Sequence, residues 1–343
     1  MTAVLAVIPC LNEKAHLPGL LDQLLADPII DLIVVADGGS TDGSRELVET
    51  RLAGEPRLRL MHNTARIQSA GVNCAVRQFG DDYDWLLRVD AHCLYPDLYA
   101  STLLAAAAES GAQSVVVPMV TRSNGGFQTA AATAQNSVIG TGGSPHRHLK
   151  NGQFVNHGHH ALMDINRFRA VGGYCEAMPC NEDAELDHRL VAAGALIWLD
   201  PRAAIDYFPR RDPIALARQY FRYGVGRARN IRRHSLRPAM RQLIPLLVPA
   251  AAMLAILAVW HPVFALPLMI WSIATIVAGV FIGLRAKSRW AMLSGVAAAI
   301  MHFGWGCGFL REWFRLSPPP DPAFGFVVHN ADKDEQAVSR LKI

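Results

Sequence analysis

Two long stretches of this sequence carry no charged side chain. Residues 243–284 and residues 290–310 contain no Asp, Glu, Lys or Arg, and the short segment Arg285-Ala-Lys-Ser-Arg289 separates them. A helix needs about 20 apolar residues to cross a bilayer, so the first stretch is long enough for two helices and the second for one. Trp260-His261-Pro262 marks a break, because proline disfavours helix at the residue before it and Trp suits a membrane interface. We therefore expect membrane spans near residues 243–260, 263–284 and 290–310, rather than a buried hairpin of a soluble protein, whose helices normally show a polar stripe.

An arginine-rich segment precedes the first apolar stretch. Residues 207–241 contain ten Arg and one Asp, whereas the whole chain has a net charge of only +4. Basic residues beside a spanning helix are typical of the cytoplasmic side and attract anionic lipid, and Arg285, Lys287 and Arg289 mark the same side. A nucleic-acid patch is the competing interpretation. We predict no nucleic-acid partner, because the position beside the membrane favours lipid head groups or a lipid-linked phosphate.

The residues before this segment are expected to form a separate cytoplasmic domain. The chain has 51% hydrophobic and 18% charged residues, which excludes a disordered chain, and residues 4–8 are too short for the apolar core of a signal peptide. Six cysteines without a Cys-x-x-Cys pair indicate reduced thiols. The predicted organisation is a catalytic domain over 1–206, an interfacial segment over 207–242, a membrane domain of about three helices over 243–311, and a tail over 312–343. Three crossings would place that tail outside, whereas Arg311 and Arg315 favour the cytoplasm.

Short apolar runs alternate with helix-like stretches in the first 90 residues. The runs are residues 4–8, 32–35, 58–60 and 85–89, and the helix-like stretches are residues 15–26, 43–52 and 68–78. This alternation predicts βαβ units and a mainly parallel sheet, in which ligands bind beyond the carboxyl ends of the strands. Polar residues follow the runs at those ends, among them Glu13, Asp37 and Asp90.

Three motifs at these strand ends resemble those of the family 2 glycosyltransferases. Ile8-Pro-Cys-Leu-Asn-Glu13 is similar to the family's Pro-x-x-Asn-Glu segment, Asp37-Gly-Gly-Ser-Thr-Asp42 to its Asp-x-Gly-Ser-Thr-Asp turn, and Arg88-Val-Asp90-Ala-His92 to its acidic metal motif. The resemblance implies the α/β GT-A fold, a Rossmann-like domain that binds a nucleotide-sugar, followed here by C-terminal transmembrane helices. The nucleotide-binding residues that it implies are Pro9, Asn12, Glu13 and Asp37.

The metal motif departs from the family pattern at its last position. The family usually has Asp-x-Asp, whereas this chain has Asp90-Ala-His92. A divalent metal that bridges a nucleotide diphosphate prefers oxygen ligands, and imidazole suits Mn²⁺ better than Mg²⁺. The resemblance implies that Asp90 binds Mg²⁺ or Mn²⁺, and that His92 either joins it as a ligand or hydrogen-bonds a phosphate. The alternative is an ordinary Asp at a strand end.

Two further sites are implied by the resemblance. Arg66 falls in a segment that lies beside the sugar nucleotide, where it can pair with phosphate oxygens, although pairing with Glu55 is an alternative. In the acidic cluster Asn181-Glu182-Asp183, the family's Glu-Asp pair implies a binding role for Glu182 and the catalytic base at Asp183. An inverting transfer needs such a base to take the proton of the acceptor hydroxyl, while the metal offsets charge on the leaving diphosphate. A helix start capped by Asn181 would explain the cluster on structural grounds alone.

Two other motifs allow more than one role. The cluster His157-Gly-His159-His160 lacks the spacing of a zinc site, and we expect contacts to the acceptor or a phosphate, or simple packing of imidazoles. Arg218-Gln-Tyr-Phe-Arg222-Tyr223 lies where processive polysaccharide synthases carry Gln-x-x-Arg-Trp, which implies phosphate contacts by Arg218 or Arg222. Tyrosine in place of that tryptophan argues against processive synthesis.

The combined motifs and the apolar C-terminal part are most similar to succinoglycan-type exopolysaccharide glycosyltransferases. This resemblance implies an inverting, metal-dependent hexosyltransferase, multi-pass in the inner (cytoplasmic) membrane, with its catalytic domain in the cytoplasm. It would transfer glucose from UDP-glucose, a UDP-sugar donor, to a polyprenyl-diphosphate-linked saccharide, and it suggests other polysaccharide-assembly enzymes as partners. The alternatives are a polyprenyl-phosphate glycosyltransferase and a non-catalytic membrane scaffold with a degenerate nucleotide fold.

Overall fold

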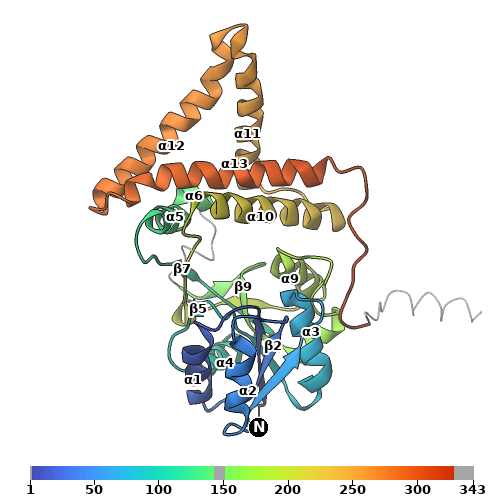
Figure 1. Cartoon of the computed structure of the whole chain (residues 1–343). Coiled ribbons are helices and arrows are strands. Elements are labelled where there is room, and N and C mark those ends of the chain that lie inside the picture. Colours follow the sequence, from blue (N-terminus) through green and yellow to red (C-terminus); the bar gives the residue numbers. More distant parts are fainter. Residues whose placement is uncertain (1, 143–150, 328–343) are drawn as a thin grey trace, which may run out of the picture.

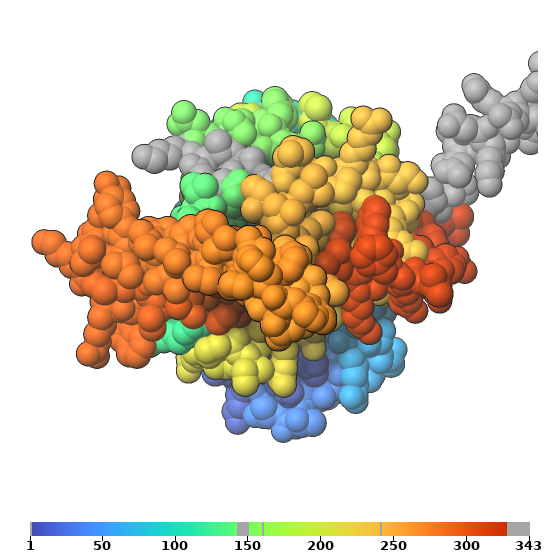
Figure 2. Space-filling view, turned by 90° about the horizontal axis from the view of Figure 1, so that it is seen from above, coloured from blue at the N-terminus to red at the C-terminus, as the bar shows by residue number. Residues whose placement is uncertain are grey.

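The computed structural model describes residues 2–142 and 151–327, without the side chains of His160 and Arg241. It has an α/β domain, a layer of long helices above it, and a helical hairpin that projects from this layer (Figure 1). Seen from above in Figure 2, the hairpin (orange) lies nearest the viewer and the α/β domain (blue) lies behind it.

The α/β domain is built on an eight-stranded sheet with the strand order β3-β2-β1-β4-β9-β6-β10-β8. The strands are β1 (Val4–Cys10), β2 (Ile30–Asp37), β3 (Leu58–His62), β4 (Trp85–Arg88), β6 (Ser114–Val117), β8 (Gln153–Phe154), β9 (His159–Asp164) and β10 (Ile197–Leu199). Strands β1 to β4 are parallel, as predicted. Strand β9 runs antiparallel to both neighbours and β8 runs antiparallel to β10, whereas β6 and β10 run in the direction of β1 to β4. The sheet is therefore mainly parallel, as predicted, with two antiparallel strands.

Helices cover both faces of the sheet, which is why the central strands are apolar throughout. One face packs against α1 (Leu17–Ala26), α2 (Ser44–Leu52) and α4 (Tyr99–Ser110), and the other against α3 (Gln68–Phe79), α8 (Ile165–Ala170) and α9 (Glu182–Ala192). Alternate residues of β1 serve the two faces: Ile8 joins the first core and Val7 the second. The short helices Gly80–Asp82 and Pro201–Ala203 complete the domain.

A smaller sheet connects the domain to the helices above it. It contains β5 (Cys93–Leu94), β11 (Ile205–Tyr207) and β7 (Met119–Thr121), in that order. Beyond β7 lie α5 (Phe127–Gln135) and α6 (Val138–Thr141), and beyond β11 lies α10 (Pro213–Arg233). Helix α10 begins with a proline in its first turn and with Asp212, whose carboxylate accepts a hydrogen bond from the backbone of Ala215.

Helix α10 lies side by side with α13 (Ser294–Trp313), and the two form the layer above the domain (Figure 1). Glycines let the backbones approach closely. A Cβ on Gly224 would lie 2.0 Å from the carbonyl oxygen of Trp305, and a Cβ on Gly308 would lie 2.0 Å from that of Phe221. Helix α5 packs against the other end of α13, through small residues such as Ala130 and Ala297.

The hairpin consists of α11 (Met240–Ala255) and α12 (Leu266–Arg285), joined by the short helices Ile256–Val259 and Pro262–Ala265. Its turn lies at Trp260 and His261, as predicted. A third short helix, Ala291–Leu293, leads from α12 to α13.

Three helical segments of the described chain are long and apolar enough to cross a membrane: Gln242–Val259, Pro262–Arg285 and Ala291–Trp313. They match the three predicted segments, but they do not form a bundle of three similar helices. In the most apolar 18-residue stretch of each of the first two segments, 11% of the residues are buried. In the third segment the share is 50%, because this helix packs along α10.

After α13 the chain turns back along the outside of the α/β domain (Figure 1). We call residues 314–327 the return segment. The backbone N–H of Glu176 donates to the carbonyl of Ala323 over 2.7 Å, and Cys175 forms an antiparallel bridge with Phe324. The predicted boundary of the catalytic domain at residue 206 therefore misses a piece of chain that packs on it.

Candidate active site

A small pocket opens where the predicted residues of β1 and β4 meet. Its volume is about 180 Å³, and it is lined by Pro9, Cys10, Leu11, Glu13, Gly38, Asn63, Arg66, Ile67, Gln68, Asp90, Ala91 and His92. Five of the predicted site residues, Pro9, Glu13, Arg66, Asp90 and His92, therefore lie in one pocket at the carboxyl edge of the parallel strands. This is the place where such sheets bind ligands.

Asp37 and Asn12 do not line this pocket, but they hold the turn beside it in place. The Asp37 carboxylate is 1% exposed and accepts hydrogen bonds from the backbone N–H groups of Gly39 and Ser40, both over 3.1 Å. Asn12 Oδ1 accepts from the backbone N–H of Thr41 over 2.8 Å. These bonds fix the turn at residues 37–42 against the loop that follows β1.

Arg66 lies over the glycine turn just before α3 begins. Its φ is +58°, and its Nη2 atom lies 3.3 Å from where a Cβ on Gly39 would be. The alternative pairing with Glu55 is not found, because Glu55 pairs with Arg57 at 3.6 Å. The exposed guanidinium therefore stands at the pocket, where an anion would meet it.

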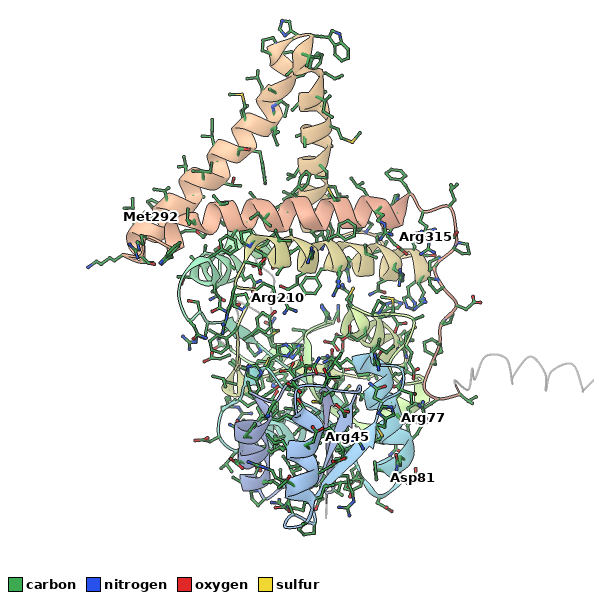
Figure 3. The ribbon with its side chains drawn as sticks, in the orientation of Figure 1. Arg45, Arg77, Asp81, Arg210, Met292 and Arg315 are labelled. Carbon is green, nitrogen blue, oxygen red and sulfur yellow. The ribbon has the colours of Figure 1, made fainter. Side chains whose placement is uncertain are left out.

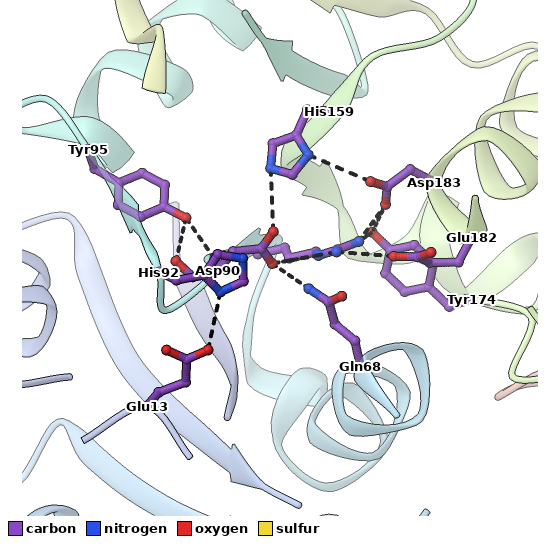
Figure 4. A network of polar contacts seen from close by, with 10 residues as sticks. Glu13, Gln68, Asp90, His92, Tyr95, His159, Tyr174, Glu182 and Asp183 are labelled. Carbon is purple, nitrogen blue, oxygen red and sulfur yellow. Dashed lines mark hydrogen bonds and ion pairs between the residues drawn. The ribbon is translucent and has the colours of Figure 1, made fainter. Parts of the chain in front are cut away.

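Glu13 and His92 contact each other across the pocket (Figure 4). Glu13 Oε1 lies 3.2 Å from His92 Nδ1. This hydrogen bond raises the pKa of His92 against the effect of burial, and nearby Arg210 opposes the rise. Burial would raise the pKa of Glu13, but hydrogen bonds to His92 and His16 outweigh burial and lower it. The contact between Glu13 and His92 therefore favours the charged form of both side chains.

A buried arginine joins the two predicted acidic sites. Arg88 of β4 is 4% exposed. Its Nη1 donates to Asp183 Oδ1 and, over 3.0 Å, to the Tyr174 hydroxyl, while its Nη2 lies 3.2 Å from Glu182 Oε1 and 3.5 Å from Asp90 Oδ1. Although burial disfavours the guanidinium cation, the charges of Asp183 and its neighbours hold the pKa of Arg88 well above its ordinary value.

The carboxylates around Arg88 differ in their affinity for protons. Burial raises the pKa of Glu182 to about 7, and the adjacent charge of Asp183 adds to the effect. Burial also acts to raise the pKa of Asp90, but Arg88 and His159 outweigh it, so this pKa is lowered. Asp90 therefore stays ionised at neutral pH, while Glu182 titrates there.

The histidine cluster lies at the start of β9, next to the same carboxylates. His159 stands between two of them (Figure 4), with Nε2 3.7 Å from Asp90 Oδ2 and Nδ1 3.8 Å from Asp183 Oδ2. His157 Nδ1 lies 2.7 Å from Asp187 Oδ2. The side chain of His160 lies outside the described residues. His159 thus contacts the acidic residues that follow β4 and begin α9, while His157 contacts Asp187 in the middle of α9.

The acidic pair is attached to the helical layer. Asn181, with φ +59°, does not cap α9 with its side chain as expected; its Nδ2 donates instead to the carbonyl of Tyr223 on α10, over 3.1 Å. Cys180 Sγ donates to the carbonyl of Arg222. Arg218 and Arg222 are exposed on α10 and do not line the pocket of Asp90.

Several residues of this network were not identified as site residues from the sequence. Gln68 Nε2 donates to Asp90 Oδ1, and the Tyr95 hydroxyl accepts from the Asp90 backbone N–H over 2.7 Å. Arg88 and Tyr174 hold Asp183. The feature of the sequence that could have indicated this network is Arg88 itself. An arginine inside the apolar run of a central parallel strand needs buried anionic partners.

The donor set around Asp90 fits a divalent metal only in part. Among the described residues, no three His, Cys, Asp or Glu side chains are grouped so that they could hold a metal ion by themselves. Asp90 offers an ionised oxygen ligand, and a metal such as Mg²⁺ takes its remaining ligands from substrate phosphates and water. Asp90, with or without His92, would therefore hold a metal that arrives with a diphosphate.

Comparison with known proteins yields one family. The model of the family "Glycosyl transferase family 2" matches residues 5–171. The chain is 45% identical over 313 residues to the succinoglycan biosynthesis protein ExoA of Rhizobium meliloti (strain 1021), covering 91% of this chain and 95% of that protein. It is 36% identical over 91 residues to the undecaprenyl-phosphate mannosyltransferase of Micrococcus luteus, covering 26% of this chain and 37% of that protein.

A solved structure confirms the predicted fold class. The mannosyltransferase PcManGT from Pyrobaculum calidifontis, in complex with GDP-Man and Mn²⁺, superimposes with a TM-score of 0.60. The alignment covers 92% of this chain and 88% of that one, at 17% sequence identity. The shared feature is the fold, since identity at this level carries no residue roles.

Proposed function

The chain belongs to glycosyl transferase family 2, and from this premise we propose that it transfers a hexose from a nucleotide-sugar to a lipid-linked saccharide at the membrane surface. We take UDP-glucose as the donor, a polyprenyl-diphosphate-linked saccharide as the acceptor and exopolysaccharide biosynthesis as the role. The similarity to the succinoglycan biosynthesis protein supports these choices. The observation that carries the proposal is the Arg88 network, which holds Asp90 beside the nucleotide pocket and Asp183 beneath α10.

The nucleotide-sugar would occupy the pocket beside β1. Pro9 and Glu13 would line the nucleoside site that Asn12 and Asp37 shape, and Arg66 would pair with the diphosphate. Asp90 would hold Mg²⁺ or Mn²⁺, which when bound offsets charge on the leaving diphosphate. His92, whose pKa is raised by its hydrogen bond to Glu13, would donate a hydrogen bond to a phosphate rather than bind the metal.

Asp183 would act as the catalytic base. Arg88 and the Tyr174 hydroxyl both contact Asp183 Oδ1, which leaves Oδ2 on the side of His159. Oδ2 would take the proton of the acceptor hydroxyl as that oxygen bonds to the anomeric carbon and the carbon–oxygen bond to the diphosphate breaks. Attack opposite the leaving group inverts the anomeric centre. Glu182, which gains or loses a proton near neutral pH, would set the net charge beside Asp183.

The lipid part of the acceptor would reach this site along the helical layer. Large apolar side chains such as Leu247, Ile270 and Phe281 project from α11 and α12, as the sticks of Figure 3 show for the hairpin as a whole. Arg218 and Arg222, exposed on α10, would contact the lipid diphosphate. The bilayer therefore surrounds the hairpin, and the catalytic domain lies against its cytoplasmic face, in our proposal that of the inner membrane.

The return segment favours two crossings of this membrane instead of three. It packs on the same α/β domain that precedes the helices, through the backbone bonds at Glu176 and Cys175. A chain that leaves and returns to one side crosses an even number of times. We therefore propose that α11 and α12 cross, and that α13 lies in the interface beside α10.

The experiment that tests the function measures radiolabel from UDP-glucose in butanol-extractable lipid. Membranes that contain the protein are supplied with Mn²⁺, Mg²⁺ or a chelator. We expect metal-dependent labelling by the wild type, and loss of transfer with retained nucleotide binding in Asp183→Asn. Asp81→Asn is the matched control, because its carboxylate lies on the outside of the catalytic domain (Figure 3) and is 84% exposed. Near-normal turnover of Asp183→Asn would refute the assignment of the base.

A second candidate is transfer to a bare polyprenyl phosphate, which the similarity to the undecaprenyl-phosphate mannosyltransferase favours. The same assay separates the two candidates when polyprenyl phosphate and polyprenyl-diphosphate sugar are supplied in parallel, with GDP-mannose as a second donor. Label in polyprenyl phosphate alone would favour this candidate over the first.

A further inference from the structure

The return segment contacts the catalytic domain next to the tyrosine that holds the proposed base. Beyond its backbone bonds to Glu176 and Cys175, the Phe326 N–H donates to the carbonyl of Gly172 over 3.2 Å, and the carbonyl of Gly325 accepts from Arg77 over 2.9 Å. Figure 3 shows Arg77 on the side of the domain along which the chain returns. We call residues 323–326 the strap.

The aromatic side chains of the strap pack on two arginines, one of which, Arg189, holds the segment before Tyr174. The Phe324 ring lies 4.6 Å from the Arg189 guanidinium, and Arg189 Nη2 donates to the carbonyl of Gly173 over 2.7 Å. The Phe326 ring lies 5.8 Å from the guanidinium of Arg169, and its centroid is 6.0 Å from that of Phe168. The strap thus covers residues 172–174 on the side that faces away from the active site.

Asn73 connects the strap to the Tyr174 backbone. Its side chain is fully buried, accepts from the Tyr174 N–H over 2.9 Å and donates to the Tyr174 carbonyl over 2.8 Å. Gly325 packs directly on this amide: a Cβ at Gly325 would lie 2.5 Å from Asn73 Cγ. Gly173 has φ +69°, and a Cβ there would lie 2.9 Å from the Phe326 ring. A larger residue at Gly325 therefore does not fit unless the strap lifts, and a Cβ at Gly173 would also lie 2.6 Å from Asn73 Oδ1.

The hydroxyl of Tyr174 reaches the active site from this fixed backbone. Its ring is fully buried and packs at 5.5 Å from Phe168. The hydroxyl donates to Asp183 Oδ1 over 3.1 Å and accepts from Arg88 over 3.0 Å (Figure 4). A continuous path of contacts therefore runs from the strap through Asn73 and Tyr174 to Asp183.

We propose that the strap is a positioning element for the transfer reaction: by fixing the Tyr174 backbone, Gly325 and Phe326 hold the hydroxyl that orients Asp183. This inference rests on the proposed role of Asp183 as the base. It makes the chain that follows the membrane helices part of the catalytic domain, and it predicts an effect on turnover rather than on donor binding, because no strap residue lines the nucleotide pocket.

The test is a double-mutant cycle with the labelling assay, which measures kcat and the donor KM. Gly325→Val displaces the strap, Tyr174→Phe removes the hydroxyl, and Val327→Ala is the control because its side chain is 77% exposed. We expect each of the first two variants to lower kcat about tenfold, as for loss of one hydrogen bond to a charged group, with an unchanged donor KM. The double variant should be no slower than Tyr174→Phe alone, and Val327→Ala should match the wild type.

Three results would overturn the inference: wild-type kcat in Gly325→Val, losses that multiply in the double variant, or a rise in donor KM that matches the loss of kcat. If Gly325→Val does not accumulate in membranes, Phe326→Ala replaces it in the same cycle and the same results decide. Failure of the proposed function is distinguishable, because the wild type itself would then label no lipid. An active wild type with multiplying losses refutes the strap alone.

Discussion

Arg88→Met tests whether the buried arginine is what allows the acidic groups of the site to lie together. Arg88 is the cation that contacts Asp90, Glu182 and Asp183, whose side chains are only 12–16% exposed. Methionine keeps much of the side-chain volume but removes the charge and all of these hydrogen bonds. The variant therefore leaves buried carboxylates without their shared partner.

The variant should be less stable because the buried carboxylates lose the positive charge that compensates their own. Removing one partner of a buried ion pair costs about 3–5 kcal/mol of unfolding free energy, because the remaining charge stays buried. This corresponds to a fall in Tm on the order of 10 °C. The loss should shrink at low pH. Without the cation, the native-state pKa of Asp90 rises, and that of Glu182, already above its ordinary value, rises further. The native state then holds protons that the unfolded chain has released, and stability falls as pH rises.

The assay is thermal unfolding of the purified protein in detergent, followed by tryptophan fluorescence at about pH 5 and about pH 8. Arg122→Met is the matched control, because Arg122 is 58% exposed, forms a surface ion pair with Asp206 and should cost less than about 1 kcal/mol. We expect a large fall in Tm for Arg88→Met at the higher pH and a smaller one at the lower pH. Equal effects of the two substitutions, or a loss for Arg88→Met that does not change with pH, would refute the reasoning.

Two further outcomes are expected. The native pKa of Glu182, about 7, lies above its ordinary value of 4.5, so this group contributes stability below pH 4.5 that is lost as pH rises through 7. Glu182→Gln should therefore gain Tm relative to the wild type between about pH 5 and about pH 8, and parallel Tm curves would contradict this. For the two-crossing topology, a green fluorescent protein fused after Ile343 should fluoresce in the cytoplasm and an alkaline phosphatase fused after His261 should be active outside. A dark fluorescent fusion with an active phosphatase at the same carboxyl end would instead indicate three crossings.

The first half of the fold could be predicted because each element there carries its own periodic signal. Strands β1 to β4 and helices α1 to α3 appear where the apolar runs and helix-like stretches predicted them. The two antiparallel strands, β8 and β9, had no such signal, because their direction depends on the long connections that lead to them. Strand direction is a property of the connection rather than of the residues within the strand.

The candidate site was predicted in its motifs but not in its connections. Asp90 and Asp183 were singled out because the motifs around them resemble the metal motif and the Glu-Asp pair of the family. That Arg88 joins them required the distance between β4 and α9, which no local pattern contains. Hydropathy likewise predicted α13 as an apolar helix, whereas its position beside α10 depends on glycines such as Gly308 matching a neighbour's backbone.

The attachment of the acidic loop to α10 has a consequence for the reach of the enzyme. Cys180 and Asn181 are hydrogen-bonded to backbone carbonyls of a helix that lies along the proposed membrane surface, one residue before the acidic pair begins. The height of Asp183 above the bilayer is then set by one helix and cannot vary freely. For the lipid-linked acceptor that we propose, the sugar would be within range only when its lipid anchor and preceding sugars carry it to that height. The enzyme would thus select acceptors by how far they stand from the membrane, as well as by the shape of the sugar.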